Sequence, residues 1–399
     1  MKSYMDVIDF INNTKLNLEN QYYSTGEELK KDFFKINSLV WKDLNDLFYE
    51  DLSNVYEIHK YLVDEVCKIH EEEYDDYNSR ILKENINIKK IENELKDGKR
   101  AFNIYSLNEE GFEYYLIGDI HSDTISIKRV LEKVDFFNRI VNKEKIRLVF
   151  LGDYVDRGKK HLECLQYILS LKYIFSENVY ILRGNHDGGS IKDGEVVSWV
   201  RVPEEDDKDD WFYHYLYHLT DVNKTIKSDI IEIYSRFFDS LCNIVFICNK
   251  NIVMATHGGL PRYKKDRDRY YYYINSISDL TNKEIVDNLN KTIVDNMMWS
   301  DPSINGKDLR EDNGRFRFSE EHFEEFKDLI GFDLFVRGHE AEFKGYHKFF
   351  NDNLITIFSS GIILENDENI NRETAYKSVE PKILKVDEKS KISIIDINK

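Results

Sequence analysis

Five short apolar segments of the chain are each followed by side chains that can bind a metal ion or move a proton. The segments are typical of buried strands, and Asp, His and Asn residues stand where each segment ends. These residues are Asp119 and His121 in LIGDIHSD, Asp153, Asp156 and Arg157 in LGDYVDRG, Asn185 and His186 in LRGNHD, His257 in ATHGG, and His339 in VRGHE. Because strand ends are rigid supports, they can hold such side chains at fixed distances. The pattern therefore indicates a metal centre.

The types of ligand limit which metal ions and which reactions are plausible at this centre. Asp, His and Asn side chains without thiolates suit borderline or harder divalent ions such as Mn, Fe or Zn. Three Asp and His ligands are enough for one ion, and an Asn and two further His with a shared carboxylate are enough for a second. Because two neighbouring ions can clamp a phosphoryl group and generate a hydroxide, the residues point to hydrolysis of a phosphate ester.

The elements that must position these residues are those of a layered α/β domain. The early strands alternate with helical segments around 127–140 and 161–175, and the later part of the chain is rich in strands. The segments AFNIYSL and FEYYLIGDI, separated by residues 108–111, predict a hairpin. We therefore expect mixed sheets with helices packed on them.

The first hundred residues predict helices instead. Overlapping capping boxes at 24–28 precede apolar residues at helical spacing over 36–47, and a second apolar stripe covers 55–69. A third predicted helix covers 82–95 and meets a glycine at position 98. We interpret residues 1–100 as a helical N-terminal extension that targets, regulates or caps a catalytic domain over 101–399.

Composition excludes several classes of protein. The chain has 399 residues, of which 41% are hydrophobic, and a net charge of −18, so it is globular and its average surface repels nucleic acid and anionic lipid. The four scattered cysteines suggest neither a disulfide framework nor a zinc ribbon. With no signal peptide and no long apolar stretch, we expect a soluble cytoplasmic protein that does not bind nucleic acid or insert into membranes, although secretion without a cleaved signal would leave no mark. Residues 191–210 carry a net charge of −5 and predict a long loop or insertion.

The motifs GDIHSD, GDYVDRG, RGNHD, HGG and RGHE, in this order, resemble the signature of the phosphoprotein phosphatases, the serine/threonine phosphatase branch of the calcineurin-like metallophosphoesterases. The resemblance covers about residues 112–365. It implies a central β-sandwich of mixed sheets flanked by helices. It also implies hydrolysis of phosphoserine or phosphothreonine, with phosphotyrosine as a further option, in a phosphorylated protein or peptide.

The same resemblance assigns a role to each residue of the motifs. Two divalent ions are expected, Mn first, with Fe or Zn as alternatives. The implied ligands are Asp119 and His121 for the first ion, Asp153 as a bridge, and Asn185, His257 and His339 for the second. A hydroxide that bridges the ions would attack phosphorus directly, without a phosphoenzyme. His186 resembles the general acid, Asp156 its partner and Arg157 the phosphate-binding arginine.

Some positions depart from the family pattern. Ser122 replaces a glycine, and Asp187 replaces a longer acidic residue. We assign the second phosphate-binding arginine to Arg315, with Arg310 and Arg317 as close alternatives. The expected tyrosine is missing from FSSGIILEN, and His257 follows Asn185 by 72 positions, which is a long interval for the family. The first two changes are mild, whereas the others concern the contacts with substrate.

Two other functions fit the same residues. The first is hydrolysis of a dinucleoside polyphosphate or another small phosphate ester, because related enzymes use similar ligands. The second is a non-catalytic scaffold of the same fold. The N-terminal helices also offer a surface for a regulatory partner.

Overall fold

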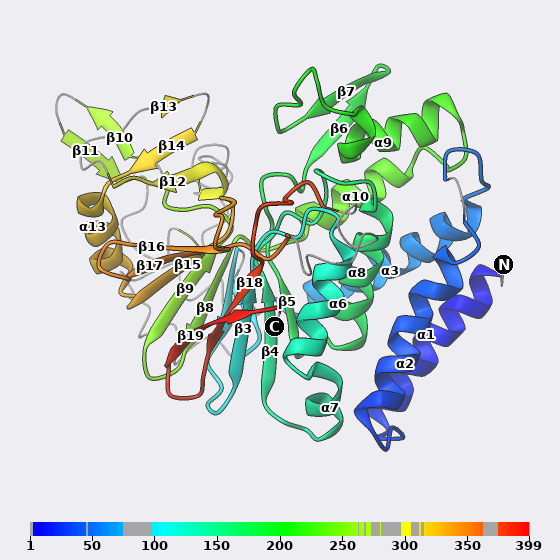
Figure 1. Ribbon diagram of the computed structural model, residues 1–399, viewed down its shortest axis with the longest axis horizontal. Coiled ribbons are helices and arrows are strands. Elements are labelled where there is room, and N and C mark those ends of the chain that lie inside the picture. Colours follow the sequence, from blue (N-terminus) through cyan, green and yellow to red (C-terminus); the bar gives the residue numbers. More distant parts are fainter. Residues whose placement is uncertain are drawn as a thin grey trace.

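The architecture comes from a computed structural model that describes most of the chain. The described residues are 3–44, 47–74, 97–101, 103–261, 263–266, 269–272, 280, 297–304, 311–312, 315–361 and 374–398. Two sheets form the centre of the molecule (Figure 1). The larger sheet has the order β1-β2-β8-β9-β15-β17-β16, and the smaller has the order β19-β18-β3-β4-β5.

The strands of the larger sheet are β1 (Arg100–Ala101), β2 (Ile104–Leu107), β8 (Ile244–Cys248), β9 (Ile252–Thr256), β15 (Leu334–Arg337), β16 (Tyr346–Phe349) and β17 (Leu354–Ile357). The strands of the smaller sheet are β3 (Glu113–Ile117), β4 (Ile146–Phe150), β5 (Val179–Ile181), β18 (Lys382–Val386) and β19 (Ile392–Asp396). Both sheets are mixed: β3, β4 and β5 are parallel, as are β9, β15 and β17, whereas β18 and β16 pair antiparallel with their neighbours.

The two sheets face each other across an apolar core. Leu116 and Val149 of the smaller sheet lie in one buried cluster with Val253 and Val336 of the larger sheet. All four side chains are buried, which is the pattern of strands covered on both faces. The predicted sandwich of mixed sheets is confirmed.

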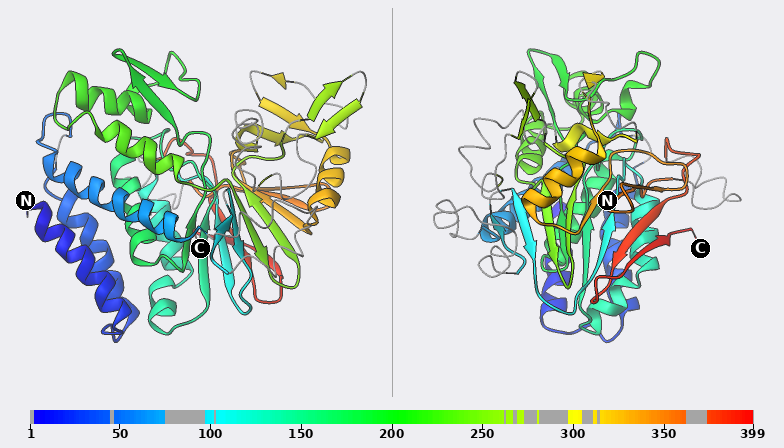
Figure 2. Two further views of the ribbon diagram at one scale, coloured as in Figure 1. Left: turned by 180° about the vertical axis from the view of Figure 1, so that it is seen from behind. Right: turned by 90° about the vertical axis from the view of Figure 1, so that its left-hand side faces the viewer.

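Helices cover the outer faces of the sandwich (Figures 1 and 2). On the smaller sheet lie α6 (Thr124–Lys133), α7 (Phe136–Val141) and α8 (His161–Ile174). Over these pack α1 (Tyr4–Glu19), α2 (Gly26–Trp41) and α3 (Ser53–Glu72), and α10 (Ile230–Asp239) packs against α3. On the larger sheet lies α13 (Glu320–Ile330), which buries Phe323 and Phe326 against Phe335.

Small peripheral sheets lie beyond one end of the sandwich (Figure 1). One consists of β6 (Gly189–Lys192) and β7 (Glu195–Ser198), and another of β10 (Tyr263–Asp266) and β11 (Arg269–Tyr272). A third has the order β12 (Ser300–Pro302), β14 (Arg315–Phe318), β13 (Glu311–Asp312). The acidic segment 191–210 therefore contains regular secondary structure, namely β7 and the 3-10 helix η1 (Lys208–Asp210).

The N-terminal helices form largely as the sequence predicts. Thr25 caps α2, and Glu28 completes the capping box. The second apolar stripe is α3. The helix α1 has no counterpart among the predicted helices, and the predicted helix over 82–95 lies outside the described residues. Phe33 of α2 and Val66 of α3 belong to the same buried cluster as Leu165 of α8, so these helices share a core with the rest of the chain.

The predicted hairpin is wrong. β2 pairs with β1 and β8 in the larger sheet, while β3 pairs with β4 and β18 in the smaller one. The chain therefore crosses between the sheets at residues 108–112. The alternating pattern identified the two strands, but pairing is decided by which sheet buries them, and β2 is buried along its whole length.

No helix among the described residues is both long enough and apolar enough to cross a membrane.

Candidate metal centre

The side chains that the sequence singled out converge at one end of the sandwich. They follow β3, β4 and β5 of the smaller sheet and β9 and β15 of the larger sheet, so they lie where the carboxyl ends of parallel strands meet. The metal-ligand candidates are all at most 8% exposed: Asp119, His121, Asp153, Asn185, His257 and His339. The structure brings together every one of these six residues.

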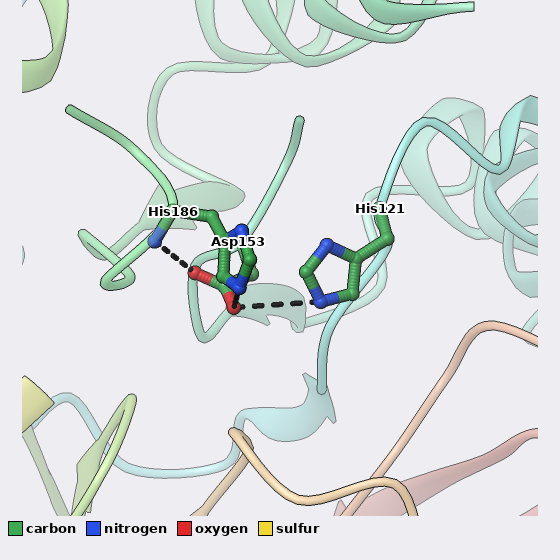
Figure 3. A group of neighbouring side chains, drawn as sticks. All are labelled: His121, Asp153 and His186. Atoms are coloured by element: carbon green, nitrogen blue, oxygen red, sulfur yellow. Dashed lines mark hydrogen bonds and ion pairs between the residues drawn. The ribbon is translucent and has the colours of Figure 1, made fainter. Parts of the chain in front are cut away.

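One group of donors surrounds His121 (Figure 3). Its Nε2 lies 3.5 Å from Oδ2 of Asp119 and 3.5 Å from Oδ2 of Asp153. His186 approaches the same carboxylate, with Nε2 4.0 Å from Asp153 Oδ2. His121, Asp153 and His186 present ligand atoms close enough to hold a metal ion.

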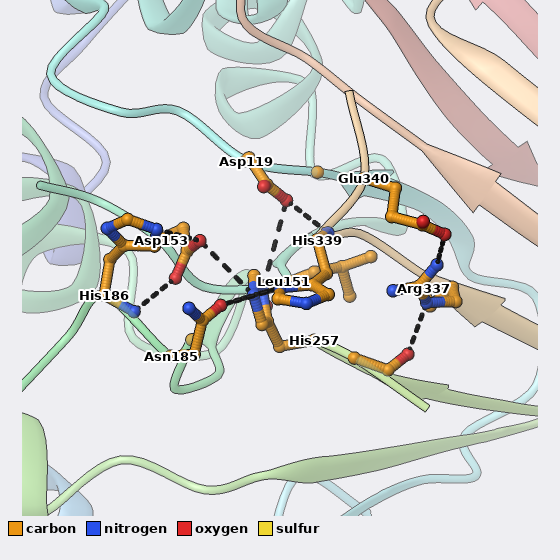
Figure 4. Close-up of polar contacts among 12 residues, drawn as sticks. Asp119, Leu151, Asp153, Asn185, His186, His257, Arg337, His339 and Glu340 are labelled. Atoms are coloured by element: carbon orange, nitrogen blue, oxygen red, sulfur yellow. Dashed lines mark hydrogen bonds and ion pairs between the residues drawn. The ribbon is translucent and has the colours of Figure 1, made fainter. Parts of the chain in front are cut away.

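A second group shares Asp153 with the first (Figure 4). Nε2 of His257 lies 2.8 Å from Oδ1 of Asn185 and 3.3 Å from Oδ2 of Asp153. Nδ1 of His339 lies 2.8 Å from the same Asn185 oxygen and 3.2 Å from His257 Nε2. Two donor groups therefore meet at one carboxylate.

The separations between donor atoms fit a shared cation. With metal–ligand bonds of about 2.1 Å, neighbouring ligand atoms lie about 3.0 to 3.4 Å apart, depending on the coordination geometry. The observed separations of 2.8 to 3.5 Å span this range.

Hydrogen bonds behind the imidazoles fix which nitrogen faces the site. Nδ1 of His121 donates to the carbonyl oxygen of Val155 (2.9 Å), and Nδ1 of His257 donates to that of Leu151 (3.0 Å). In a neutral imidazole the other nitrogen then carries a lone pair, and it points at carboxylate and amide oxygens. Such acceptors repel each other unless a cation lies between them, so the residues fit a metal ion.

The charges of the site favour a cation as well. Burial alone lowers the pKa of His257, but the carboxylates of Asp153 and Asp119 outweigh it and raise that pKa to about 9. Burial raises the pKa of Asp153, yet the imidazoles of His257 and His186 hold it well below its usual range. The buried carboxylates therefore attract either protons or metal ions to this position.

His186 and Asp156 form a buried pair beside the donor groups. Nδ1 of His186 lies 2.7 Å from Oδ2 of Asp156, whose other oxygen accepts a hydrogen bond from the backbone N–H of Phe212 (2.6 Å). The second imidazole nitrogen of His186 is thereby turned toward the side of Asp153. A carboxylate that holds one nitrogen of an imidazole orients the other for proton transfer. Arg157, half-buried, lies in the same loop.

The backbone at the site is under strain in several loops. His121, Asp153, Asp156, Arg157 and His339 all have a positive φ, between 46° and 73°. Non-glycine residues seldom adopt this conformation, which costs of order 1–3 kcal/mol and occurs at functional sites. The close approach of the loops also needs glycine at position 184, where a Cβ would lie 2.3 Å from the backbone nitrogen of Asp153.

The two mild departures from the family pattern have local partners. Ser122 lies with its Oγ 2.9 Å from Nδ1 of His161. The short carboxylate of Asp187 accepts hydrogen bonds from the backbone N–H groups of Asp153 (2.8 Å), Tyr154 (2.9 Å) and Gly184 (2.8 Å). Asp187 thus joins the loop after β4 to the loop after β5.

Arg337 braces the same region from the larger sheet (Figure 4). Its buried guanidinium donates to the carbonyl oxygen of Gly258 (2.6 Å) and pairs with Asp301 (2.8 Å) and Glu340 (2.7 Å). It therefore fixes the loops that carry His257 and His339.

The second phosphate-binding arginine stays a prediction. Arg310 lies outside the described residues, the side chain of Arg315 is not described, and Arg317 is exposed. The backbone of β14, which carries Arg315 and Arg317, pairs with β12.

Sequence reasoning missed two aromatic residues at the site. Tyr376 does bring a tyrosine there, from a segment later than FSSGIILEN, and its ring centroid lies 5.3 Å from that of His121. Trp211 stacks on His186 with ring centroids 5.9 Å apart. No motif marks either residue, and only the long interval before His257 indicated that additional chain could reach the site.

Residues 112–343 match the sequence model of a family described as calcineurin-like phosphoesterase. The match covers more than half of the chain and includes all six metal-ligand candidates, but it leaves out α1, α2 and α3.

Two proteins of similar sequence are named serine/threonine-protein phosphatases. The probable serine/threonine-protein phosphatase ECU05_0440 of Encephalitozoon cuniculi is 29% identical over 255 residues, which are 63% of this chain and 48% of that protein. Serine/threonine-protein phosphatase BSL2 of Arabidopsis thaliana is 28% identical over 255 residues, which are 61% of this chain and 22% of that protein. The chain therefore spans less than half the length of either relative.

A solved structure shares the fold. It is a protein serine/threonine phosphatase from Saccharomyces cerevisiae with similarity to human phosphatase PP5. The TM-score is 0.53 at 17% sequence identity, over 84% of this chain and 90% of the other.

Proposed function

The chain belongs to the calcineurin-like phosphoesterase family, and from this premise we propose that it is a metal-dependent phosphoprotein phosphatase acting on phosphoserine and phosphothreonine. The observation that carries the proposal is that the donors around His121 and those around His257 share Asp153, with the His186–Asp156 pair close by. Such a site can neutralise a phosphoryl group and protonate the leaving oxygen in one place. Phosphotyrosine is a further substrate for the same chemistry.

The family implies divalent metal ions, and we assign one to the donors around His121 and one to the donors around His257. Asp119, His121 and Asp153 would hold the first ion, and Asn185, His257 and His339, with Asp153, the second. When bound, such ions supply Lewis acidity and activate water as the nucleophile. The donor set of nitrogen and oxygen atoms supports Mn, with Fe or Zn as alternatives.

The chain's own residues would do the remaining work. His186 would hold a proton at Nε2 for the departing serine or threonine oxygen, which is a poor leaving group unless it is protonated. Asp156 would stabilise that proton by accepting from Nδ1. Arg157 would bind two phosphoryl oxygens with its planar fork, and Arg315 or a neighbouring arginine would bind a third.

Several observations favour a phosphoprotein over a small phosphate ester. The motif containing Asp156 and Arg157 leans toward the protein phosphatases, and the two relatives described above are named serine/threonine-protein phosphatases. The alternative substrates are dinucleoside polyphosphates.

We further propose that residues 1–100 are an extension of the catalytic domain over 101–399. The contacts of α3 with α8 and α10 support a capping role, since these helices bury part of the core. A regulatory partner would bind the outer surface of the same helices.

The proposal is tested by phosphate release from phosphoserine, phosphothreonine and phosphotyrosine peptides and from diadenosine tetraphosphate, with Mn added. We expect turnover of the first two peptides, and its loss in Asp119→Asn, since that change weakens the first donor group. If only the nucleotide is hydrolysed, the substrates are dinucleoside polyphosphates rather than phosphoproteins. No turnover by protein with demonstrably bound metal would favour a scaffold.

A further inference from the structure

The segment between His186 and β8 reaches back to the proposed catalytic residues. After β7 it forms η1, and Trp211 then leads into α9 (Phe212–Tyr217). Figure 1 shows β6, β7 and α9 grouped beyond one end of the central strands. The long interval in the sequence is therefore a structured element beside the site.

Trp211 lies against the side chains proposed to handle the proton and the phosphate. It is 1% exposed, and its ring is within 25° of parallel to that of His186, with centroids 5.9 Å apart. The guanidinium carbon of Arg157 lies 4.5 Å from the centroid of the Trp211 ring. One indole thus contacts both the imidazole and the guanidinium.

The Trp211 ring lies over the guanidinium of Arg157 and is an aromatic contact rather than a polar one. Within the described part of the chain, Arg157 makes no hydrogen bond or ion pair, and its Nε is buried. A carboxylate partner would occupy the edge of the guanidinium, whereas an aromatic face leaves all of its N–H donors free. Arg157 is therefore held in a form that can still bind an anion.

The chain around Trp211 is attached to the loop that carries Arg157. The carbonyl oxygen of Asp209 lies 3.0 Å from Nε2 of His161, and the N–H of Phe212 donates to Asp156 (2.6 Å). On the surface, Lys159 pairs with Asp207 (2.6 Å). These contacts fix Trp211 relative to Asp156 and Arg157.

We propose that Trp211 is a positioning residue, whose ring holds the Arg157 guanidinium and supports the His186 imidazole so that a phosphate ester meets both in place. The inference rests on the proposed function for the roles of Arg157 and His186. The stacking itself does not depend on that function. Preorganised donors bind a phosphoryl group with less loss of side-chain freedom.

The first test measures binding of inorganic phosphate to the full-length, metal-loaded protein by calorimetry. Trp211→Leu should raise the Kd about 3- to 30-fold, the range expected for a partly desolvated cation–π contact, and Trp211→Phe should raise it less. With a phosphoserine peptide, Trp211→Leu should raise KM as well as lower kcat. If Trp211 only fills space, a smaller fraction of the variant protein folds into the active form. In that case the apparent kcat falls and KM stays constant.

Trp199→Leu is the matched control. Trp199 lies in the same segment, and Arg183 is 4.5 Å from its ring centroid, as Arg157 is from Trp211. Arg183, however, bonds to Asp239 (2.9 Å) and to the carbonyl oxygen of Asp187 (3.1 Å), so its edge is occupied. The Kd for phosphate should change less than about twofold in this variant.

A second test separates the positioning role from the proposed function. The Nε–H signal of Arg157, assigned by NMR with the aid of Arg157→Lys, should show a ring-current shift that disappears in Trp211→Leu. If the signal moves but wild-type protein hydrolyses no phosphate ester, the phosphatase proposal fails and the positioning role stands. An unmoved signal, or an unchanged Kd for phosphate in Trp211→Leu, overturns the inference.

Discussion

Because the imidazole of His59 on α3 is buried, we expect acid to lower the free energy of unfolding of the protein. His59 on α3 is fully buried, with Nδ1 2.8 Å from the hydroxyl oxygen of Tyr234 on α10. Burial lowers its pKa from 6.5 to about 4. The native protein therefore binds this proton less tightly than the unfolded chain does. His59 contributes fully to stability above pH 6.5, and the contribution is lost as the pH falls through 4.

The size of the change in unfolding free energy follows from the pKa shift of His59. A change of one pKa unit corresponds to about 1.4 kcal/mol, so the whole contribution is roughly 3 kcal/mol, of which about 2 kcal/mol is lost between pH 7 and pH 5. His59→Gln removes the titrating group and can still accept a hydrogen bond from Tyr234. Because all other titrating groups, including the buried His70, are common to both proteins, their effects cancel in the comparison.

The assay is urea unfolding of chelator-treated wild type and His59→Gln at pH 7 and pH 5. We expect the free energy of unfolding of the wild type to fall by about 2 kcal/mol more than that of the variant. Equal losses in the two proteins would refute the reasoning, because His59 would then titrate as it does in the unfolded chain.

Other predictions concern the site and the N-terminal helices. His186→Asn should lower kcat about 10²- to 10⁴-fold on a phosphoserine peptide but far less on p-nitrophenyl phosphate, whose leaving group needs no proton; equal losses on both substrates would exclude the general-acid role. Asp187→Ala leaves backbone N–H groups of Asp153, Tyr154 and Gly184 without an acceptor, so urea unfolding should show a loss of at least about 2 kcal/mol, whereas the exposed Glu195→Ala should show none. Deletion of residues 1–74 should give aggregated protein by size-exclusion chromatography, since it uncovers the apolar face of α8; a monomeric truncated protein would contradict the shared core.

The sequence could predict that the site residues converge, because each of them is placed by a short stretch of neighbouring sequence. Asp119, Asp153 and Asn185 each follow a buried strand, and the carboxyl ends of parallel strands meet at one edge of a sheet. The start of α2 could be predicted for the same reason, because a capping box involves residues only three positions apart.

The features that the sequence did not reveal depend on tertiary contacts. The partner of β2 is β8, about 140 residues away, so no local turn signal could show that β2 and β3 belong to different sheets. Trp211 and Tyr376 reach the site from segments without any motif, and aromatic residues are usually part of the core. Their positions follow only from how the insertion and the C-terminal strands pack.

The central claim is that Asp153 joins two donor groups that hold metal ions for phosphate ester hydrolysis. The most direct measurement combines the metal content of the purified protein with phosphate release from a phosphoserine peptide, in wild type and in Asp153→Asn, with circular dichroism as a control for folding. We expect two equivalents of divalent metal and turnover in the wild type, and a loss of both in the folded variant. Undiminished turnover in folded Asp153→Asn would contradict the account.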